Sequence, residues 1–262
     1  MENKPLVVSI VGKGGSGKTV ITTLLAKFIS RNYEYKLLLI DADPTHPHLS
    51  HMVNLVPEKS LEQLRTEVID EILTKADDFE KVAQNIDFEV YNAIAESKIF
   101  SVFSIGQPEG PGCFCPSNTL LRKVIGSISK DFDMVLIDCE AGLEQINRMV
   151  IETVDIILIV SDMSIRSIDT AATIRDSAKK FTKCKKLGVV LNRVKGNTNL
   201  IKKKLQELNL PLLVEVPEDS AIMNIELRGE PVINIPEVSV CSLAINKLVK
   251  IILDPEFFKN KV

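Results

Sequence analysis

The sequence predicts an α/β domain with a mainly parallel, twisted sheet of about seven strands and helices on both faces. Seven short apolar runs rich in Val and Ile support this prediction, and most of them are continuous rather than alternating, as in strands buried on both faces. Helix-like stretches, such as those at 18–31 and 167–181, lie between them, and this rhythm is typical of a parallel sheet. The runs occupy residues 6–11, 36–41, 100–105, 134–138, 156–160, 187–192 and 212–216.

Length and composition predict one domain over residues 1–262. The chain has 45% hydrophobic and 26% charged residues, an ordinary globular composition. Residues 57–98 differ, because Glu, Asp and Lys recur there at helical spacing. We expect this segment to be a helical insertion at the edge of the sheet.

Charge and hydropathy limit the classes of binding partner and the cellular compartment that we expect. The net charge of −3 gives no basic field of the kind that nonspecific nucleic-acid binding needs, so we expect no nucleic-acid partner. The first apolar run is interrupted by Gly12 and Lys13, too early for a signal sequence, and no later run is long enough to span a membrane. Five cysteines, an odd number, argue against a disulfide framework. These observations predict a cytoplasmic protein with no membrane partner.

A glycine-rich segment between the first run and the first helix carries the clearest chemistry. Residues 12–19 read GKGGSGKT, a complete G-x-x-x-x-G-K-T in the strand-to-helix context that a phosphate-binding loop requires. Its glycines let backbone N–H groups surround phosphate, Lys18 neutralises the β- and γ-phosphates, and Thr19 offers a hydroxyl to Mg²⁺. The predicted nucleotide contacts are Gly12, Lys13, Gly14, Gly15, Ser16, Gly17, Lys18, Thr19 and Val20. We therefore predict an ATPase with Mg²⁺ as cofactor.

An early lysine in this loop adds a second expectation. The K-G-G-x-G-K-T pattern resembles the deviant Walker A motif of the SIMIBI class, whose members include the MinD and ParA ATPases and the nitrogenase iron protein. The resemblance implies a nucleotide-sandwich homodimer in which Lys13 reaches the partner's phosphates and acts in catalysis with Lys18. On sequence grounds alone, the alternative is that Lys13 is a solvated loop lysine.

Acidic residues follow two of the predicted strands. The second strand ends in DADP and the fourth in LIDCEAG, and doubly wound sheets bind ligands at the carboxyl ends of their strands. By the resemblance, Asp43 positions or activates the attacking water and contributes to the Mg²⁺ site, and Asp138 holds Mg²⁺ in the Walker B role. Asp41 is expected to be a strand-end cap.

The same resemblance extends to later positions. Gly142 matches a switch glycine that meets the γ-phosphate, and Asn192 and Arg193 lie where the class contacts the base. A looser match places a segment bordering the purine and ribose at Pro217, Glu218, Asp219 and Glu226. The acidic residues of that segment could equally be solvated charges.

A C-x-C pair suggests a metal site. Cys113 and Cys115 lie in a Gly- and Pro-flanked loop, and residues i and i+2 of an extended chain face the same way. Two thiolates are too few for a closed site, which usually takes four, but a two-fold dimer doubles them. Zn²⁺ and Ni²⁺ both suit such a site, and the sequence does not choose between them.

The C-x-C setting GCFCPSNTLLR and the stretch DCEAGLEQINR narrow the resemblance to the CooC-type ATPases. That family matures carbon monoxide dehydrogenase by helping to insert nickel. The resemblance implies that ATP drives dimerisation and makes or opens the Cys113/Cys115 site, with a carbon monoxide dehydrogenase-like metalloenzyme as client.

Two alternative functions remain open. An ATP-dependent reductase of the iron-protein type would carry an intersubunit [4Fe–4S] cluster, although the second cysteine of that family is missing near Gln145. A MinD/ParA-like positioning ATPase would use the amphipathic C-terminus at 242–262 on a membrane, but its first part is expected to be a core helix. His46, His48 and His51 could bind metal, and the simpler interpretation is exposed imidazoles in a Pro-containing loop.

Overall fold

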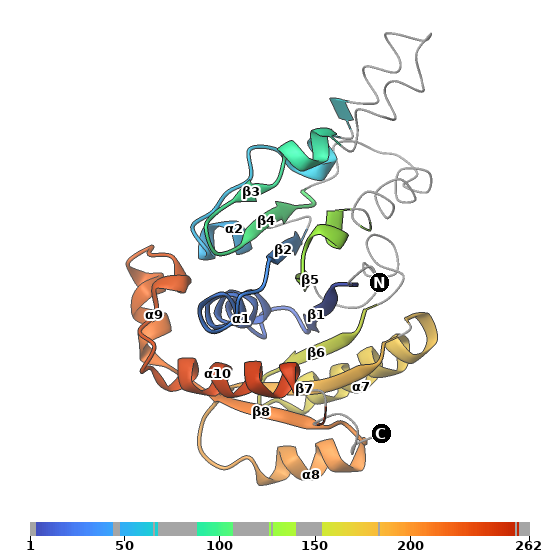
Figure 1. The fold of residues 1–262 in the computed structure, drawn as a ribbon. Helices are drawn as coiled ribbons and strands as arrows, with labels where there is room; N and C mark the ends of the chain where they lie inside the picture. Colours follow the sequence, from blue (N-terminus) through green and yellow to red (C-terminus); the bar gives the residue numbers. More distant parts are fainter. Residues whose placement is uncertain are drawn as a thin grey trace.

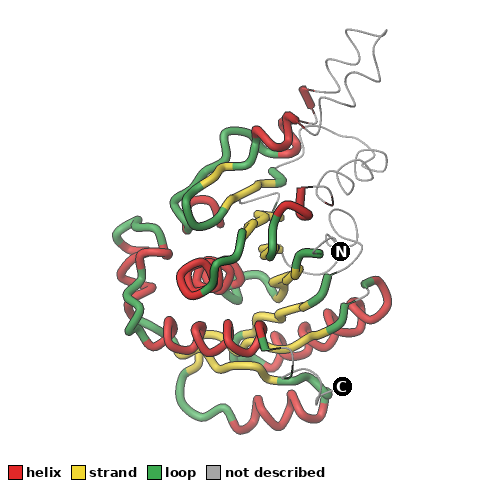
Figure 2. The backbone as a smooth tube through the Cα atoms, viewed as in Figure 1, coloured by secondary structure: helices red, strands yellow, loops and turns green. Residues whose placement is uncertain are grey.

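The computed structural model describes residues 4–43, 48–64, 66–67, 88–106, 126, 128–139, 154–182, 184–254 and 256 of the chain. Within these ranges one sheet of eight strands forms the centre of the molecule, and helices lie on both of its faces (Figures 1 and 2). The strand order is β3-β4-β2-β5-β1-β6-β7-β8, and every neighbouring pair is parallel except β3 with β4. The α/β class predicted from the sequence is confirmed.

The strands coincide with the seven apolar runs, with one addition. The seven are β1 (Leu6–Gly12), β2 (Leu37–Ala42), β4 (Ser101–Ser104), β5 (Met134–Cys139), β6 (Ile156–Ser161), β7 (Lys186–Val194) and β8 (Leu212–Pro217). The eighth, β3 (Ala95–Glu96), is an antiparallel edge strand of two residues. The sequence predicts about seven strands and the sheet has eight, because the two residues of β3 are too few to form an apolar run.

Each face of the sheet has its own hydrophobic core, since side chains alternate between faces along a strand. One core contains Val7 and Val11 of β1 and is covered by α7 (Ile165–Phe181) and α8 (Asn199–Glu207). The other contains Val8 and Ile10 of the same strand. This second face is covered by α1 (Lys18–Asn32), α2 (Leu49–Met52), α9 (Ser220–Leu227) and α10 (Val240–Leu253). Two short 3₁₀ turns, η1 (Ser129–Asp131) and η2 (Val232–Asn234), complete the described elements.

The described part of the 57–98 segment includes the edge strand β3 and lies at the end of the sheet that β3 and β4 form. Residues 61–64 and 88–92 are helical, and the chain then enters β3. Leu61, Leu64 and Val90 are buried in the core under that edge. The predicted single-domain organisation stays a prediction.

Helix α10 is a core helix, as expected for the first part of the C-terminal segment. Cys241, Ile245, Leu248 and Ile252 are among its buried residues, and the helix packs against β8 and α1. None of the described helices combines the length and the apolar composition that crossing a bilayer requires.

Candidate functional site

The glycine-rich segment forms a tight loop between the central strand β1 and helix α1. β1 lies between β5 and β6, so the strand order diverges on its two sides at this point, where doubly wound sheets place ligands. Ser16 N–H donates to the Lys13 carbonyl at 3.2 Å, and Ile21 N–H donates to the Gly17 carbonyl at 3.0 Å, which starts the helix. The loop is therefore set against the positive N-terminal end of α1.

Two positions of the loop, Gly12 and Gly17, must be glycine because neighbouring atoms lie where a Cβ would be. Gly12 has φ +150°, and a Cβ there would lie 2.2 Å from the Val160 carbonyl oxygen of β6. Gly17 has φ +94°, and its Cβ would lie 2.3 Å from Nδ2 of Asn192. Both conformations are strained for residues with a side chain. The loop backbone can therefore lie this close to the sheet only because these positions lack a Cβ.

Three carboxylates gather at the carboxyl ends of β2 and β5. Asp41 and Asp138 are register partners on these adjacent strands, and Asp43 follows β2 directly. Burial, with the Asp138 carboxylate next in importance, raises the pKa of Asp41 to about 7. The Asp41 carboxylate accepts the N–H groups of Asp43 at 3.3 Å and Leu49 at 3.0 Å. It thus caps the strand end, as predicted.

Asp138 is buried directly beneath the loop. Burial raises its pKa to about 6, whereas hydrogen bonds from Thr19 and Thr22 and the charge of Lys18 act in the opposite direction. The Thr22 hydroxyl lies 3.2 Å from Oδ1 of Asp138 and 3.0 Å from the Lys18 carbonyl. Thr22 is a site residue that the sequence motifs do not predict. Its position three residues after Thr19, on the same helix face, is the sequence signal that could have found it.

Lys13 and Lys18 differ in their surroundings. The Lys18 ammonium lies 3.4 Å from the Lys13 carbonyl, inside the loop. The Lys13 side chain is exposed, and no ion pair joins it to another residue within the described ranges. It is also one of the charges that favour ionisation of Asp162, at the end of β6. The structure thus leaves the Lys13 ammonium at the surface of the loop.

The residues present fit a magnesium nucleotide. The Ser16 hydroxyl oxygen is buried and has no hydrogen-bond partner among the described residues. Gly14 and Gly15 face open space, since an added Cβ would meet no described atom within 4 Å. Carboxylate and hydroxyl oxygens, as on Asp138 and Thr19, are the donors that Mg²⁺ prefers.

The predicted base contacts are engaged in another way. Asn192 Nδ2 donates to the Ser16 carbonyl at 2.8 Å, and the Arg193 guanidinium donates to the Gly15 carbonyl at 3.2 Å. Both side chains come from the end of β7. They are therefore placed at the phosphate loop, and contact with a base stays a prediction.

The later acidic residues separate into different roles. Asp219 caps α9 by accepting Ala221 N–H at 2.9 Å, and it also accepts Cys241 N–H at 3.0 Å. Glu218 pairs with Lys195 at 2.6 Å. Pro217 ends β8, and Glu226 is exposed on α9. None of these side chains contacts the phosphate loop through a described hydrogen bond.

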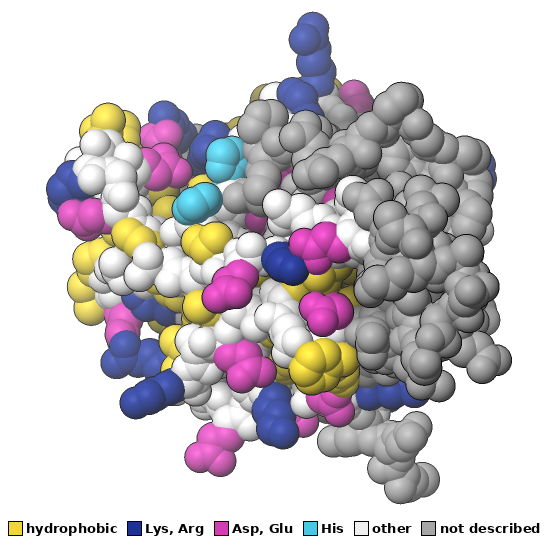
Figure 3. All heavy atoms as spheres, turned by 90° about the horizontal axis from the view of Figure 1, so that it is seen from above, with side chains coloured by type: hydrophobic (Ala, Val, Ile, Leu, Met, Phe, Trp, Pro, Cys, Tyr) yellow, Lys and Arg dark blue, Asp and Glu magenta, His cyan; other side chains and the backbone are white. Residues whose placement is uncertain are grey.

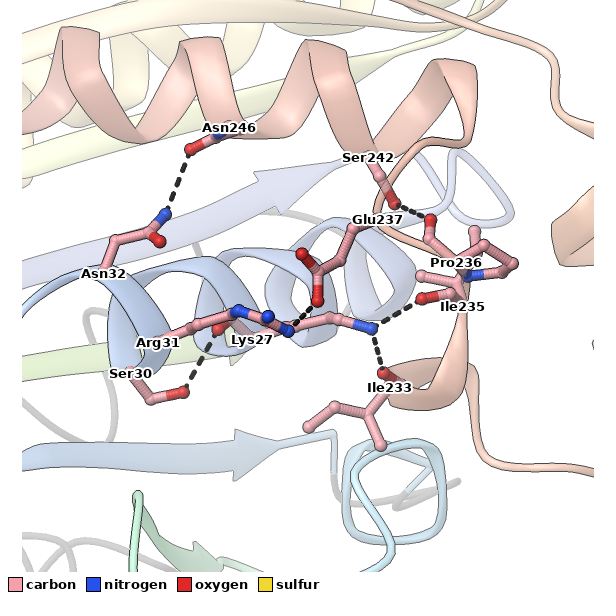
Figure 4. A network of polar contacts seen from close by, with 10 residues as sticks. All are labelled: Lys27, Ser30, Arg31, Asn32, Ile233, Ile235, Pro236, Glu237, Ser242 and Asn246. Atoms are coloured by element: carbon pink, nitrogen blue, oxygen red, sulfur yellow. Dashed lines mark hydrogen bonds and ion pairs between the residues drawn. The ribbon is translucent and has the colours of Figure 1, made fainter.

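A polar network fixes the phosphate-loop helix to the segment before α10 (Figure 4). The Lys27 ammonium donates to the carbonyls of Ile233 at 2.7 Å and Ile235 at 2.5 Å. Arg31 pairs with Glu237 one turn further along α1. Because α1 begins at the loop, this network also helps to fix the position of the phosphate loop.

The predicted metal ligands and one predicted glycine lie outside the described residues, namely Cys113, Cys115, His46 and Gly142. Figure 3 shows the described imidazoles, those of His48 and His51, on the outer surface. Among the described residues no three His, Cys, Asp or Glu side chains are placed so that they could hold one metal ion by themselves.

The remaining three cysteines are embedded in the fold. Cys139 and Cys241 are buried, and burial raises their thiol pKa values to about 12 and about 11. Cys184 is partly buried, and burial raises its pKa too. Neutral buried thiols are poor metal ligands, because the thiolate is the species that binds.

Comparison with known proteins also indicates a nucleotide-binding domain, in agreement with the geometry of the phosphate loop. The model of the CobQ/CobB/MinD/ParA nucleotide binding domain matches residues 7–232, most of the chain. The chain belongs to this family. The predicted MinD/ParA class is thereby confirmed, and the nucleotide site lies in the matched region.

Individual relatives span nearly the whole chain. An uncharacterised ATP-binding protein of Methanocaldococcus jannaschii is 32% identical over 257 residues, covering 96% of this chain and 100% of the relative. The carbon monoxide dehydrogenase accessory protein CooC of Rhodospirillum rubrum is 29% identical over 234 residues, covering 85% and 87%. The crystal structure of the cell division ATPase MinD of Pyrococcus furiosus has a TM-score of 0.68 at 26% identity, covering 94% and 98%.

Proposed function

We propose that this protein is a magnesium-dependent ATPase that dimerises with ATP and serves as a metallochaperone. The observation that carries the ATPase proposal is the cluster of Lys18, Thr19 and the buried Asp138 at the carboxyl end of the sheet. A buried carboxylate with a raised pKa, supported by a lysine and two hydroxyl groups, suits a cation site. The 32% identical relative described as ATP-binding supports the choice of nucleotide.

Each side chain has a distinct task in this proposal. Lys18 neutralises phosphate charge, and Thr19 and Asp138 would hold Mg²⁺, which offsets the charge on the phosphates. Asp43 is partly exposed beside this group and orients the attacking water. Lys13, at the loop surface, supplies its charge to the partner protomer's phosphates.

Phosphate release tests the ATPase proposal. Lys18→Gln should lower the rate by about a hundredfold, because the transition state loses a charge that no neighbour replaces. Lys247→Gln is the control, since Lys247 is exposed on α10 and makes no described contact with the loop. Equal rates for wild type and Lys18→Gln would contradict the proposal.

The metallochaperone proposal rests on the sequence and on one relative. Cys113 and Cys115 form the C-x-C pair, and the 29% identical relative CooC is named as a carbon monoxide dehydrogenase accessory protein. The other three cysteines have raised pKa values, which leaves this pair as the better candidate ligands. The cargo is Ni²⁺ or Zn²⁺, and the client is a carbon monoxide dehydrogenase-like metalloenzyme.

Metal content and oligomeric state, measured together without nucleotide and with ADP or ATP, test this part. We expect about one metal ion per two chains with ATP, since two C-x-C pairs supply four thiolates. The double variant Cys113→Ala/Cys115→Ala should bind none, and Cys184→Ala should match wild type. Unchanged metal content in the double variant would contradict the proposal. A visible iron–sulfur absorption after anaerobic reconstitution would favour the reductase instead.

A further inference from the structure

Two consecutive side chains at the end of β7 hold two consecutive carbonyl groups of the phosphate loop. Asn192 Nδ2 donates to the Ser16 carbonyl at 2.8 Å, and Arg193 Nη1 donates to the Gly15 carbonyl at 3.2 Å. In a planar trans peptide the C=O and the next N–H point in opposite directions. Fixing these carbonyls therefore fixes the orientation of the Ser16 and Gly17 N–H groups.

This orientation matters because anion-binding loops act through their backbone N–H groups. Ser16 N–H already donates within the loop, to the Lys13 carbonyl at 3.2 Å. The Asn192 contact sets the peptide between Ser16 and Gly17, at the N-terminal end of α1. A rigid loop binds phosphate without first losing conformational freedom.

The contacts are built closely into the structure. Asn192 is 6% exposed, and its amide lies so near Gly17 that a Cβ there would approach Nδ2 to 2.3 Å. Arg193 has φ +53°, a left-handed conformation that is strained for a residue with a side chain. Within the described ranges its guanidinium has no carboxylate partner, and its hydrogen bond goes to Gly15. The strained backbone directs this side chain onto the loop.

We propose that Asn192 and Arg193 are positioning residues that hold the phosphate loop in its anion-binding conformation. They act on the polyphosphate part of the ligand rather than on its base. The proposal rests on the Mg·ATP site described under Proposed function and is independent of hydrolysis, dimerisation and metal transfer. The base contact expected of these residues is the competing prediction, whereas a contact that holds the loop affects the binding of every nucleoside triphosphate alike.

Binding of Mg·ATP and Mg·GTP to the full chain tests it, with dissociation constants obtained by competition against a fluorescent nucleotide. Asn192→Leu keeps the side chain's approximate size and removes the donor. Arg193→Gly removes the guanidinium and suits the positive φ. Arg193→Lys restores a cationic donor. A thermal melt of each variant without nucleotide verifies that it is folded at the assay temperature.

We expect Asn192→Leu and Arg193→Gly each to weaken the binding of Mg·ATP and of Mg·GTP by the same factor. One lost hydrogen bond corresponds to about a five- to tenfold higher dissociation constant. Arg193→Lys should recover most of the affinity, which a purely structural role of the residue would not predict. A loss confined to ATP in Asn192→Leu would show base contact and overturn the inference. Wild-type affinities in Arg193→Gly would also overturn it. A wild-type chain that binds neither nucleotide would instead contradict the proposed function itself.

Discussion

Gly12 offers the sharpest test of how the phosphate loop is built. Its Cα lies on β1 in register with Val160 of β6, and a Cβ at this position would approach the Val160 carbonyl oxygen to 2.2 Å. That oxygen belongs to the backbone of a paired strand, so it cannot rotate away as a flexible side chain would. The backbone φ of +150° adds a conformational penalty for any residue other than glycine.

The size of the effect follows from these two terms. The unfavourable backbone conformation costs about 1–3 kcal/mol, and a clash that shifts paired strands brings the total for Gly12→Ala to about 4 kcal/mol. For a chain of this size, each kcal/mol lowers the melting temperature by about 2–4 °C, which gives a decrease of about 8–16 °C. Gly14→Ala is the matched control, because its Cβ would meet no described atom within 4 Å.

Thermal unfolding followed by circular dichroism, without nucleotide, measures both variants under the same conditions. Gly14→Ala should melt close to wild type, since a substitution in open space changes stability by no more than about 0.5 kcal/mol. If Gly12→Ala melts within about 2 °C of Gly14→Ala, the close packing of the loop against β6 would be wrong, and the described loop geometry with it.

Two further predictions concern elements around the site. Asp219→Ala should cost about 1–2 kcal/mol at pH 7, because the carboxylate caps α9. Burial opposes ionisation of the Asp219 carboxyl, but the N–H groups of Cys241 and Ala221 hold its pKa below the usual value. The stabilisation by the carboxylate is therefore fully present above about pH 4 and is lost as the pH falls through the lowered pKa. Denaturant titrations at pH 7 and pH 3 should show the difference between variant and wild type shrinking, and a constant difference would contradict the assignment. Lys27→Met should lower the melting temperature by about 4–8 °C through two unsatisfied carbonyls, whereas exposed Lys247→Met should not, and equal melting of the two variants would refute the anchoring role.

The strands were predictable because a strand that is buried on both faces is a continuous apolar run in the sequence. All seven apolar runs became strands, with ends shifted by at most two residues. Helix α7 begins at Ile165, two residues earlier than the predicted start at 167. Ser164 caps it by accepting the Ser167 N–H, and serine before a helix is a recognised start signal. Strand β3 escaped prediction because its pairing, and not its composition, defines it.

The positions of the loop and of Asp138 at strand ends could be predicted from the sequence, but the contacts of the candidate site residues could not. Asp138 lies near the end of β5 and the loop follows β1, and these two strands are adjacent in the sheet. Asn192 and Ser16 are separated by 176 positions, so the hydrogen bond between them depends on the order of β1, β6 and β7 in the sheet. The sequence alone allows Asp219 to be either a nucleotide contact or a solvated charge. Its cap of α9 is local, since Ala221 is two positions away, but its second partner Cys241 lies 22 positions away and meets it only when α9 and α10 are placed together.

The central claim is that ATP is hydrolysed in a dimer to which each protomer contributes Lys13 across the interface. Mixing two inactive variants, Lys13→Gln and Asp43→Asn, tests it most directly through phosphate release. A mixed dimer would pair an intact Asp43 in one protomer with an intact Lys13 from the other. Random mixing should therefore restore about a quarter of the wild-type rate, since half of the dimers are mixed and each has one complete site. A mixture as inactive as its components would contradict the account.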